Sequence, residues 1–227
     1  MIFGPICIFI NHLRNVLYLI VLIGYSSAHS GSYEDFFTAL VQDNPSKVQA
    51  LLNRGFDPNT VDPNGVPGLL VAINALAFNA SDVLVQWPST KVEVRNSADE
   101  SPLMLAALKG ELALCQALIK RDADVNKPGW APLHYAATGE NLDVVRLLLD
   151  ENAYIDAASP NGTTPLMMAA QYGTDAAVKL LLEAGADPQL KNEQGLSAFD
   201  FANRSGRVKT AELVAAAVRA KQPKGAW

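Results

Sequence analysis

Asn161-Gly162-Thr163-Thr164-Pro165-Leu166-Met167-Met168-Ala169-Ala170 is the stretch that decides the fold, because altered copies of it recur along most of the chain. The clearest copies are Ala131-Pro132-Leu133-His134-Tyr135-Ala136-Ala137 and Ser101-Pro102-Leu103-Met104-Leu105-Ala106-Ala107. From Pro132 to Pro165 is 33 positions, and from Pro165 to the matching Ala198 is 33 again. A motif that returns at one fixed spacing of this size indicates stacked structural repeats.

Each copy is followed by an apolar helical run, such as Val144-Val145-Arg146-Leu147-Leu148-Leu149, and then by a loop, such as Ala184-Gly185-Ala186-Asp187-Pro188. This order resembles the ankyrin repeat, whose mark is Thr-Pro-Leu-His-x-Ala and whose period is about 33 residues. The resemblance implies an all-α solenoid of about six helix-turn-helix units, joined by short β-turn fingers. It covers roughly residues 32–221.

The predicted units differ in regularity, and the terminal ones are expected to act as caps. Gly68 to Pro102 is 34 positions, so the second unit carries one extra residue within 88–95. Pro102 to Pro132 is only 30, so Lys127-Pro128-Gly129-Trp130 replaces a full finger in the fourth unit. The expected bounds are about 32–61, 62–95, 96–126, 127–158, 159–191 and 192–221, with a tail at 222–227.

Several motif residues have structural roles that follow from their chemistry. Proline is tolerated in the first turn of a helix, which suits Pro102, Pro132 and Pro165. Thr164 is expected to cap the exposed amides, and Gly185 to adopt the left-handed conformation that ends a helix. Resemblance to the family implies that the imidazole of His134 bridges backbone groups of neighbouring loops.

The first 30 residues lie outside the repeat pattern. Val16 to Gly24 is an apolar run that follows His12 and Arg14 and precedes small residues ending near Ser30. This order is typical of a secretory signal peptide, cleaved after Ala28 or Ser30. An uncleaved N-terminal anchor and a cytosolic chain are the alternatives. Export predicts a periplasmic or secreted protein that contacts a membrane only if the segment stays uncleaved.

The sequence shows no motif typical of a catalytic site or of a cofactor-binding site. It contains no Gly-x-Ser-x-Gly, His-Glu-x-x-His, phosphate-binding glycine loop or Cys-x-x-Cys motif. One histidine within the repeats cannot form a metal site by itself, and Cys115 sits where other units place a core valine. The net charge of −5 argues against nucleic acid as a partner. We therefore expect no enzyme, no cofactor, no metal and no small-molecule substrate.

In the ankyrin family, partners usually bind the concave face formed by fingers and first helices. Transferred position by position, this resemblance assigns partner binding to residues in the fingers and just after the paired alanines: Glu100, Lys109, Trp130, Thr138, Thr163, Gln171 and Tyr172. Trp130 and Tyr172 are the large aromatics among them, and such residues are frequent interface anchors. For Trp130 an equal alternative remains, in which the ring only fills the space left by the shortened finger.

The predicted function is that of an exported, non-enzymatic module that binds an unidentified partner protein. The chain resembles exported ankyrin proteins of Gram-negative bacteria, and this resemblance implies that it is located in the periplasm. Two alternatives stay open: a secreted effector directed at a host cell, and an inhibitor or antitoxin-like subunit of an envelope enzyme.

Overall fold

The computed structural model describes residues 31–221, where the chain forms six helix pairs in sequence order. The predicted signal peptide and tail lie outside the described residues. The first pair comprises the helical residues 31–41 and α2 (Pro45–Asn53). The others are α3 (Gly68–Asn74) with α4 (Phe78–Gln86), α5 (Pro102–Lys109) with α6 (Leu112–Ile119), α7 (Pro132–Ala136) with α8 (Leu142–Asp150), α9 (Pro165–Tyr172) with α10 (Asp175–Glu183), and α11 (Ala198–Arg204) with α12 (Val208–Lys221). The prediction of an all-α solenoid is confirmed.

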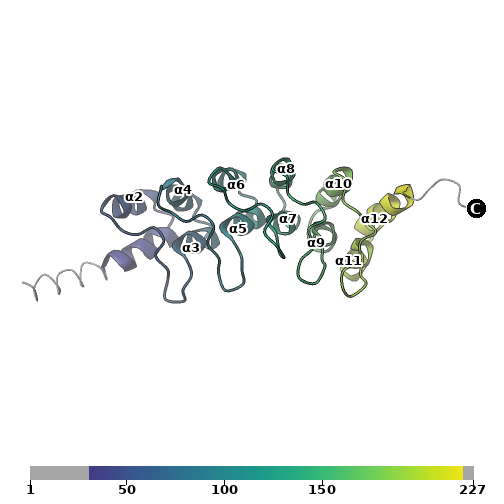
Figure 1. Cartoon of the computed structure of the whole chain (residues 1–227), viewed down its shortest axis with the longest axis horizontal. Coiled ribbons are helices and arrows are strands. Elements are labelled where there is room, and N and C mark those ends of the chain that lie inside the picture. Colours follow the sequence, from purple (N-terminus) through teal and green to yellow (C-terminus); the bar gives the residue numbers. More distant parts are fainter. Residues whose placement is uncertain (1–30, 222–227) are drawn as a thin grey trace, which may run out of the picture.

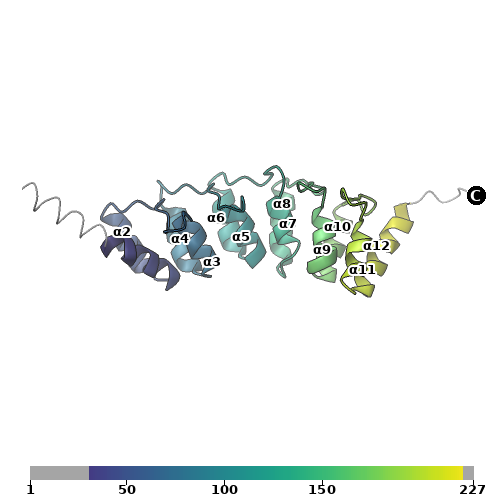
Figure 2. The same cartoon turned by 90° about the horizontal axis from the view of Figure 1, so that it is seen from below.

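The pairs stack side by side into an elongated molecule (Figure 1). The second helices α4, α6, α8 and α10 form one row, and the first helices α3, α5, α7 and α9 form a row beneath it. The fingers, which are the loops that precede the first helices, lie below this lower row in Figure 1. They lie along one edge when the molecule is turned (Figure 2). Each unit from the second to the sixth therefore contributes one finger and one first helix to the same side of the molecule.

Local sequence explains where the first helices begin. Proline stands in the first turn of α5, α7 and α9, where the missing N–H costs no hydrogen bond. The hydroxyl of Ser101 accepts a hydrogen bond from the Met104 N–H, and Thr164 does the same for Met167. Gly185, just after α10, has a φ of +107°, which only glycine adopts without strain.

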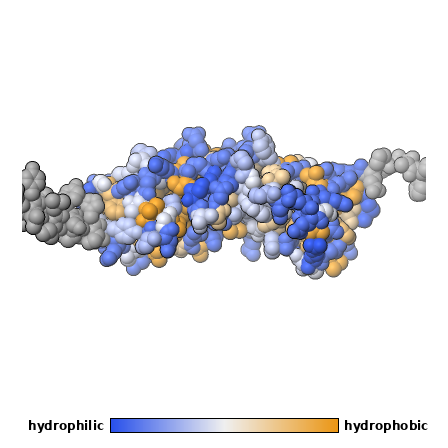
Figure 3. All heavy atoms as spheres, turned by 60° about the horizontal axis from the view of Figure 1, so that its bottom comes forward, coloured by the Kyte–Doolittle hydropathy of each residue, from blue (hydrophilic) through white to orange (hydrophobic). Residues whose placement is uncertain are grey.

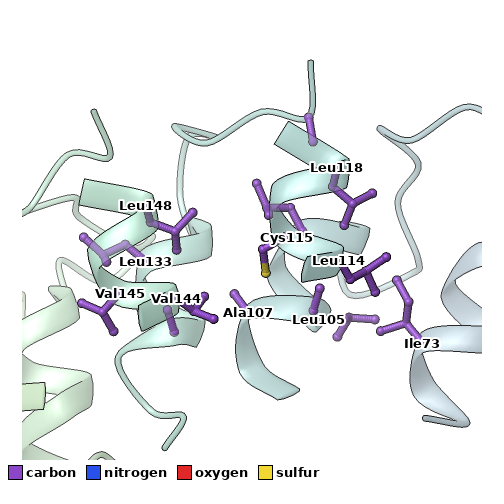
Figure 4. Packing of buried hydrophobic residues seen from close by; sticks show 14 of the residues in the cluster. Ile73, Leu105, Ala107, Leu114, Cys115, Leu118, Leu133, Val144, Val145 and Leu148 are labelled. Atoms are coloured by element: carbon purple, nitrogen blue, oxygen red, sulfur yellow. The ribbon is translucent and has the colours of Figure 1, made fainter. Parts of the chain in front are cut away.

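Small and branched apolar side chains fill the layers between successive pairs. Leu118, Leu133 and Leu148 are fully buried, and Figure 4 shows Cys115 of α6 pointing toward α5. Burial raises the pKa of the Cys115 thiol to about 12, so the group is an uncharged core residue at neutral pH. This packing matters because helices of 5 to 9 residues, such as α7 and α8, are not stable alone in water.

The irregular second unit is held by a residue from the third. Helix α4 ends at Gln86. The guanidinium of Arg121 donates hydrogen bonds to four carbonyl oxygens, one in the last turn of α4 and three in the segment after it. These acceptors are Val85, Trp87 (3.1 Å), Pro88 (3.2 Å) and Thr90 (3.0 Å). One planar side chain thus satisfies carbonyl groups that a regular helix end would leave to solvent.

A second set of contacts joins each loop to the next. A side-chain oxygen in one loop accepts a hydrogen bond from a backbone N–H about 30 residues later, at four successive steps. The pairs are Asn59 with Lys91 (2.7 Å), Glu93 with Asp124 (3.0 Å), Asn126 with Tyr154 (2.8 Å), and Asp156 with Asp187 (3.1 Å). These residues therefore connect repeats and do more than form turns.

Within residues 31–221 we find no helix with both the length and the apolar character that a bilayer crossing requires.

Candidate functional site

Two adjoining pockets open between the fingers and the first helices of the third to sixth units. The first, here called the aromatic pocket, has a volume of about 470 Å³ and is lined by Leu108, Trp130, His134, Tyr135, Thr138, Met168 and Tyr172. The second, the polar pocket, has a volume of about 320 Å³ and is lined by Trp130, Asn161, Thr163, Met168, Gln171, Tyr172, Asn192, Gln194, Leu196, Phe201 and Arg204. Trp130, Met168 and Tyr172 belong to both pockets, so the two form one continuous surface.

Five of the seven residues assigned to partner binding line this surface. Trp130, Thr138 and Tyr172 line the aromatic pocket, and Thr163 and Gln171 join Trp130 and Tyr172 in the polar pocket. Tyr172 is 63% exposed, so most of its ring is available to a partner. The structure therefore brings these five residues together from two successive units, the fourth and the fifth.

The other placements differ from the sequence-based assignment. Thr163 is only 2% exposed, so its side chain belongs to the floor of the pocket and offers little area to a partner. Lys109 is exposed at the end of α5 but lines neither pocket. Glu100 also lines neither, yet it contacts the aromatic pocket through Tyr135.

Trp130 is half-buried in the shortened finger. Its ring packs edge-on against the imidazole of His134, with ring centroids 5.2 Å apart. Gly129 before it has a φ of +79°, and the ammonium of Lys127 pairs with Asp99 of the preceding finger. Trp130 thus covers His134 with one part of its ring while it lines both pockets with the rest.

His134 itself is fully buried. Its Nδ1 accepts a hydrogen bond from the Ala131 N–H at 3.1 Å, and its Nε2 donates to the Thr163 carbonyl at 2.9 Å. Burial lowers the pKa of His134 below its usual 6.5, so the imidazole is neutral at physiological pH. The residue bridges the fourth and fifth units and forms part of the pocket floor.

Among the pocket residues that the sequence-based assignment missed, three share a signal that the repeat contains. Tyr135, Met168 and Phe201 occupy the variable position of the motif, two residues before the second of the paired alanines, or its equivalent. They are spaced by 33 residues, so they must lie side by side in a stack of that period. Residues three or four positions later on the same helix face, such as Thr138 and Tyr172, complete the surface.

Acidic groups lie beside the aromatic pocket. The Tyr135 hydroxyl donates to Oε1 of Glu100 at 3.0 Å, and Asn96 Nδ2 donates to Oε2 at 2.7 Å. Burial, together with the nearby negative charge of Glu100, raises the pKa of Tyr135, which stays protonated. Figure 3, which brings the finger side forward, shows mostly hydrophilic residues with smaller hydrophobic areas between them.

The described residues contain no group of three or more His, Cys, Asp or Glu side chains placed to hold a metal ion. The side chains that line the two pockets offer aromatic contact, hydrogen bonding and the positive charge of Arg204.

Comparison with known proteins places this geometry in a family. The sequence model described as ankyrin repeats (3 copies) matches overlapping stretches at residues 36–128, 69–159, 123–192 and 152–222. An ankyrin repeat domain from Acinetobacter baumannii AYE superposes with a TM-score of 0.68 at 24% identity, over 81% of this chain and 97% of that one. This likeness bears on the fold.

Curated relatives share the repeats within much longer proteins. The tyrosine-protein kinase Shark of Drosophila melanogaster is 29% identical over 187 residues, which is 79% of this chain and 20% of the kinase. The B-cell lymphoma 3 protein homolog of Mus musculus is 29% identical over 161 residues, 68% of this chain and 36% of that protein. The chain thus spans well under half of either relative. It belongs to the ankyrin-repeat family, whose repeats serve as protein–protein interaction modules.

Proposed function

We propose that this chain binds a partner protein on the surface formed by the aromatic and polar pockets, and that it acts without catalysing a reaction. The observation that carries this proposal is the 63% exposed ring of Tyr172 beside half-buried Trp130, at the junction of the two pockets. Large aromatic rings that stand next to a hollow are the usual anchors of protein interfaces.

Rigidity supports the same proposal. The pocket residues come from the first helices α5, α7, α9 and α11 and from the fingers between them, and these helices pack on one another in the stack. A surface that is already formed before binding loses little conformational entropy when a partner docks. The affinity can therefore come from a few contacts around Trp130 and Tyr172.

Site-specific photocrosslinking tests the location of the surface. A photoreactive phenylalanine derivative at position 172, in the full-length chain inside its native cells, should form an adduct with one discrete partner. The matched control carries the same group at position 154, where Tyr154 is 68% exposed but lines neither pocket. Equal adducts at both positions, or none at 172, would refute the proposed surface.

Substitution adds a quantitative measurement. Trp130→Ala should leave the helical circular dichroism nearly unchanged and weaken capture of the crosslinked partner about tenfold, as loss of an anchor does. A large fall in melting temperature with unchanged capture would mean that Trp130 only fills the shortened finger.

We also propose that the chain is exported, on the strength of the apolar run from Val16 to Gly24 and the small residues after it. Cell fractionation combined with N-terminal mass analysis tests this directly. Export predicts a chain shortened at Ala28 or Ser30 in the periplasmic or external fraction. A full-length chain confined to the cytosol would contradict the proposal, and a chain found in host cytosol would instead favour an effector.

A further inference from the structure

The aromatic pocket combines ring surface with a nearby acidic group that has no cationic partner among residues 31–221. Besides the imidazole of His134, three large rings line it, those of Trp130, Tyr135 and Tyr172, together with the flexible side chains of Leu108 and Met168. None of its lining residues carries a formal charge at neutral pH. The electron-rich faces of such rings attract cations, and tryptophan and tyrosine do so best.

Glu100 stands just beyond the pocket wall. Its carboxylate is one hydrogen bond from the Tyr135 hydroxyl, at 3.0 Å. The other acidic groups of this finger are neutralised within the chain, because Asp99 pairs with Lys127 and Arg95, and Glu93 pairs with Arg95.

Glu100, in contrast, forms no ion pair with any residue between 31 and 221. Among the described residues, only Tyr135 and Asn96 donate hydrogen bonds to its carboxylate. A carboxylate can accept about four hydrogen bonds, so Glu100 keeps capacity for donors that arrive from outside.

We propose that the aromatic pocket receives an arginine side chain from an exposed segment of the partner protein, with its guanidinium against the rings of Trp130 and Tyr172 and its charge directed at Glu100. This inference rests on the proposed function and specifies the chemistry of the partner. Arginine fits better than lysine because its guanidinium is planar, weakly hydrated and able to stack on rings while donating hydrogen bonds to a carboxylate.

Charge beyond the pocket agrees with this orientation. The whole chain carries a net charge of −5, which attracts a basic partner segment over a distance. The basic residue of the surface, Arg204, lines the polar pocket and stands away from Glu100, so the two ends of the surface differ in sign. An arginine entering on the Glu100 side avoids repulsion from Arg204.

The experiment uses the full-length chain and three blocked tripeptides, N-acetyl-Gly-X-Gly-amide, in which X is arginine, citrulline or leucine. Citrulline has nearly the shape of arginine without its charge. Binding is followed by nuclear magnetic resonance at the indole N–H of Trp130, assigned with Trp130→Phe. The arginine peptide should shift this resonance in a saturable manner at millimolar concentration, and the citrulline and leucine peptides should produce markedly smaller shifts.

Two variants test the assigned contacts. Glu100→Gln keeps the size of the side chain and its capacity to accept from Tyr135, and should weaken binding of the arginine peptide roughly two- to fivefold, the range of an exposed ion pair. Glu183→Gln makes the same charge change on exposed Glu183 of α10 and should have no effect. Tyr172→Leu should weaken binding as well, because it replaces a ring by an aliphatic group.

Each other outcome would overturn the inference. Equal shifts with citrulline, or stronger shifts with leucine, would mean that the pocket takes a neutral or apolar side chain. The absence of any shift, or equal affinities for the wild type and Glu100→Gln, would also reject it. Partner capture that depends on Trp130 but not on Glu100 would leave the proposed function intact, whereas capture that depends on neither would reject both.

Discussion

His134 of α7 donates a hydrogen bond from Nε2 to the carbonyl oxygen of Thr163 in the next finger, at 2.9 Å. Equivalent positions in the third and fifth units hold Met104 and Met167, each of which accepts only the local N–H of its own helix cap, at 3.4 Å. The inter-repeat bridge at the shortened fourth finger thus depends on the imidazole, with Trp130 packed over it.

The variant His134→Met tests this bridge, because it introduces the residue that the third and fifth units have at the same position. Methionine can accept from the Ala131 N–H, as it does in the neighbouring units, but cannot donate to Thr163. We expect the free energy of unfolding to fall by about 1 kcal/mol, the net worth of one hydrogen bond. Chemical denaturation measures this loss, and unchanged stability would show that the bridge contributes nothing.

The same residue predicts a dependence of stability on pH. Burial holds the pKa of His134 below 6.5 in the folded chain, whereas the unfolded chain has the ordinary value. Below about pH 6.5 the unfolded state therefore binds a proton that the folded state does not, so stability must fall as the pH falls through this window. Comparison of wild type and His134→Met between pH 7 and pH 5 should show a steeper loss for wild type. Parallel curves would contradict the assignment.

Arg121 should be required for the irregular segment after α4. Arg121→Lys keeps the charge but loses the planar fork that reaches the carbonyls of Trp87, Pro88 and Thr90. We expect a loss of about 1.5–3 kcal/mol and faster amide exchange in residues 86–92. Arg146→Lys on α8, where the side chain is 53% exposed and pairs with Asp143, serves as the control and should change stability by less than about 0.5 kcal/mol.

Gly173 lies against the backbone of the preceding unit. A Cβ atom there would overlap the carbonyl oxygen of Ala137, which is backbone and cannot move aside easily. Gly173→Ala should therefore destabilise the fold by about 1–3 kcal/mol, as overpacking does. At Gly139 the nearest atom would be 3.3 Å away, so Gly139→Ala should cost clearly less in a thermal melt. Equal costs would contradict this account.

Leu76 offers the opposite test, because it sits where the third unit has Gly110. It has a φ of 60° and is 55% exposed. The left-handed backbone therefore costs free energy that burial of the side chain does not offset. Leu76→Gly should stabilise the fold by about 1 kcal/mol, within the cost of that conformation for residues with a Cβ. Leu76→Ala retains the Cβ and should gain less. A melting temperature that falls with glycine would rule out strain at this site.

The residues that line the pockets show how much of the candidate site the repeat spacing could predict. The repeat spacing predicts Trp130, Thr138 and Tyr172 on one side of the stack, because equivalent positions must line up, and all three line the aromatic pocket. It did not reveal that Thr163 is buried, since that depends on how tightly the finger packs against His134. Nor did it connect Glu100 to Tyr135, which are 35 residues apart and meet only through side-chain geometry.

The sequence by itself determined the all-α repeat architecture, because prolines in first helical turns, capping hydroxyls and alternating apolar positions act within a few residues and recur at a countable spacing. Resemblance to the family already implied the bridge that His134 makes between neighbouring loops, but only the tertiary structure decided that Arg121 joins the irregular second unit to the third. It also decided which side chains surround the two pockets. Such contacts join residues about 30 positions apart, and their distances depend on side-chain packing that no local pattern encodes.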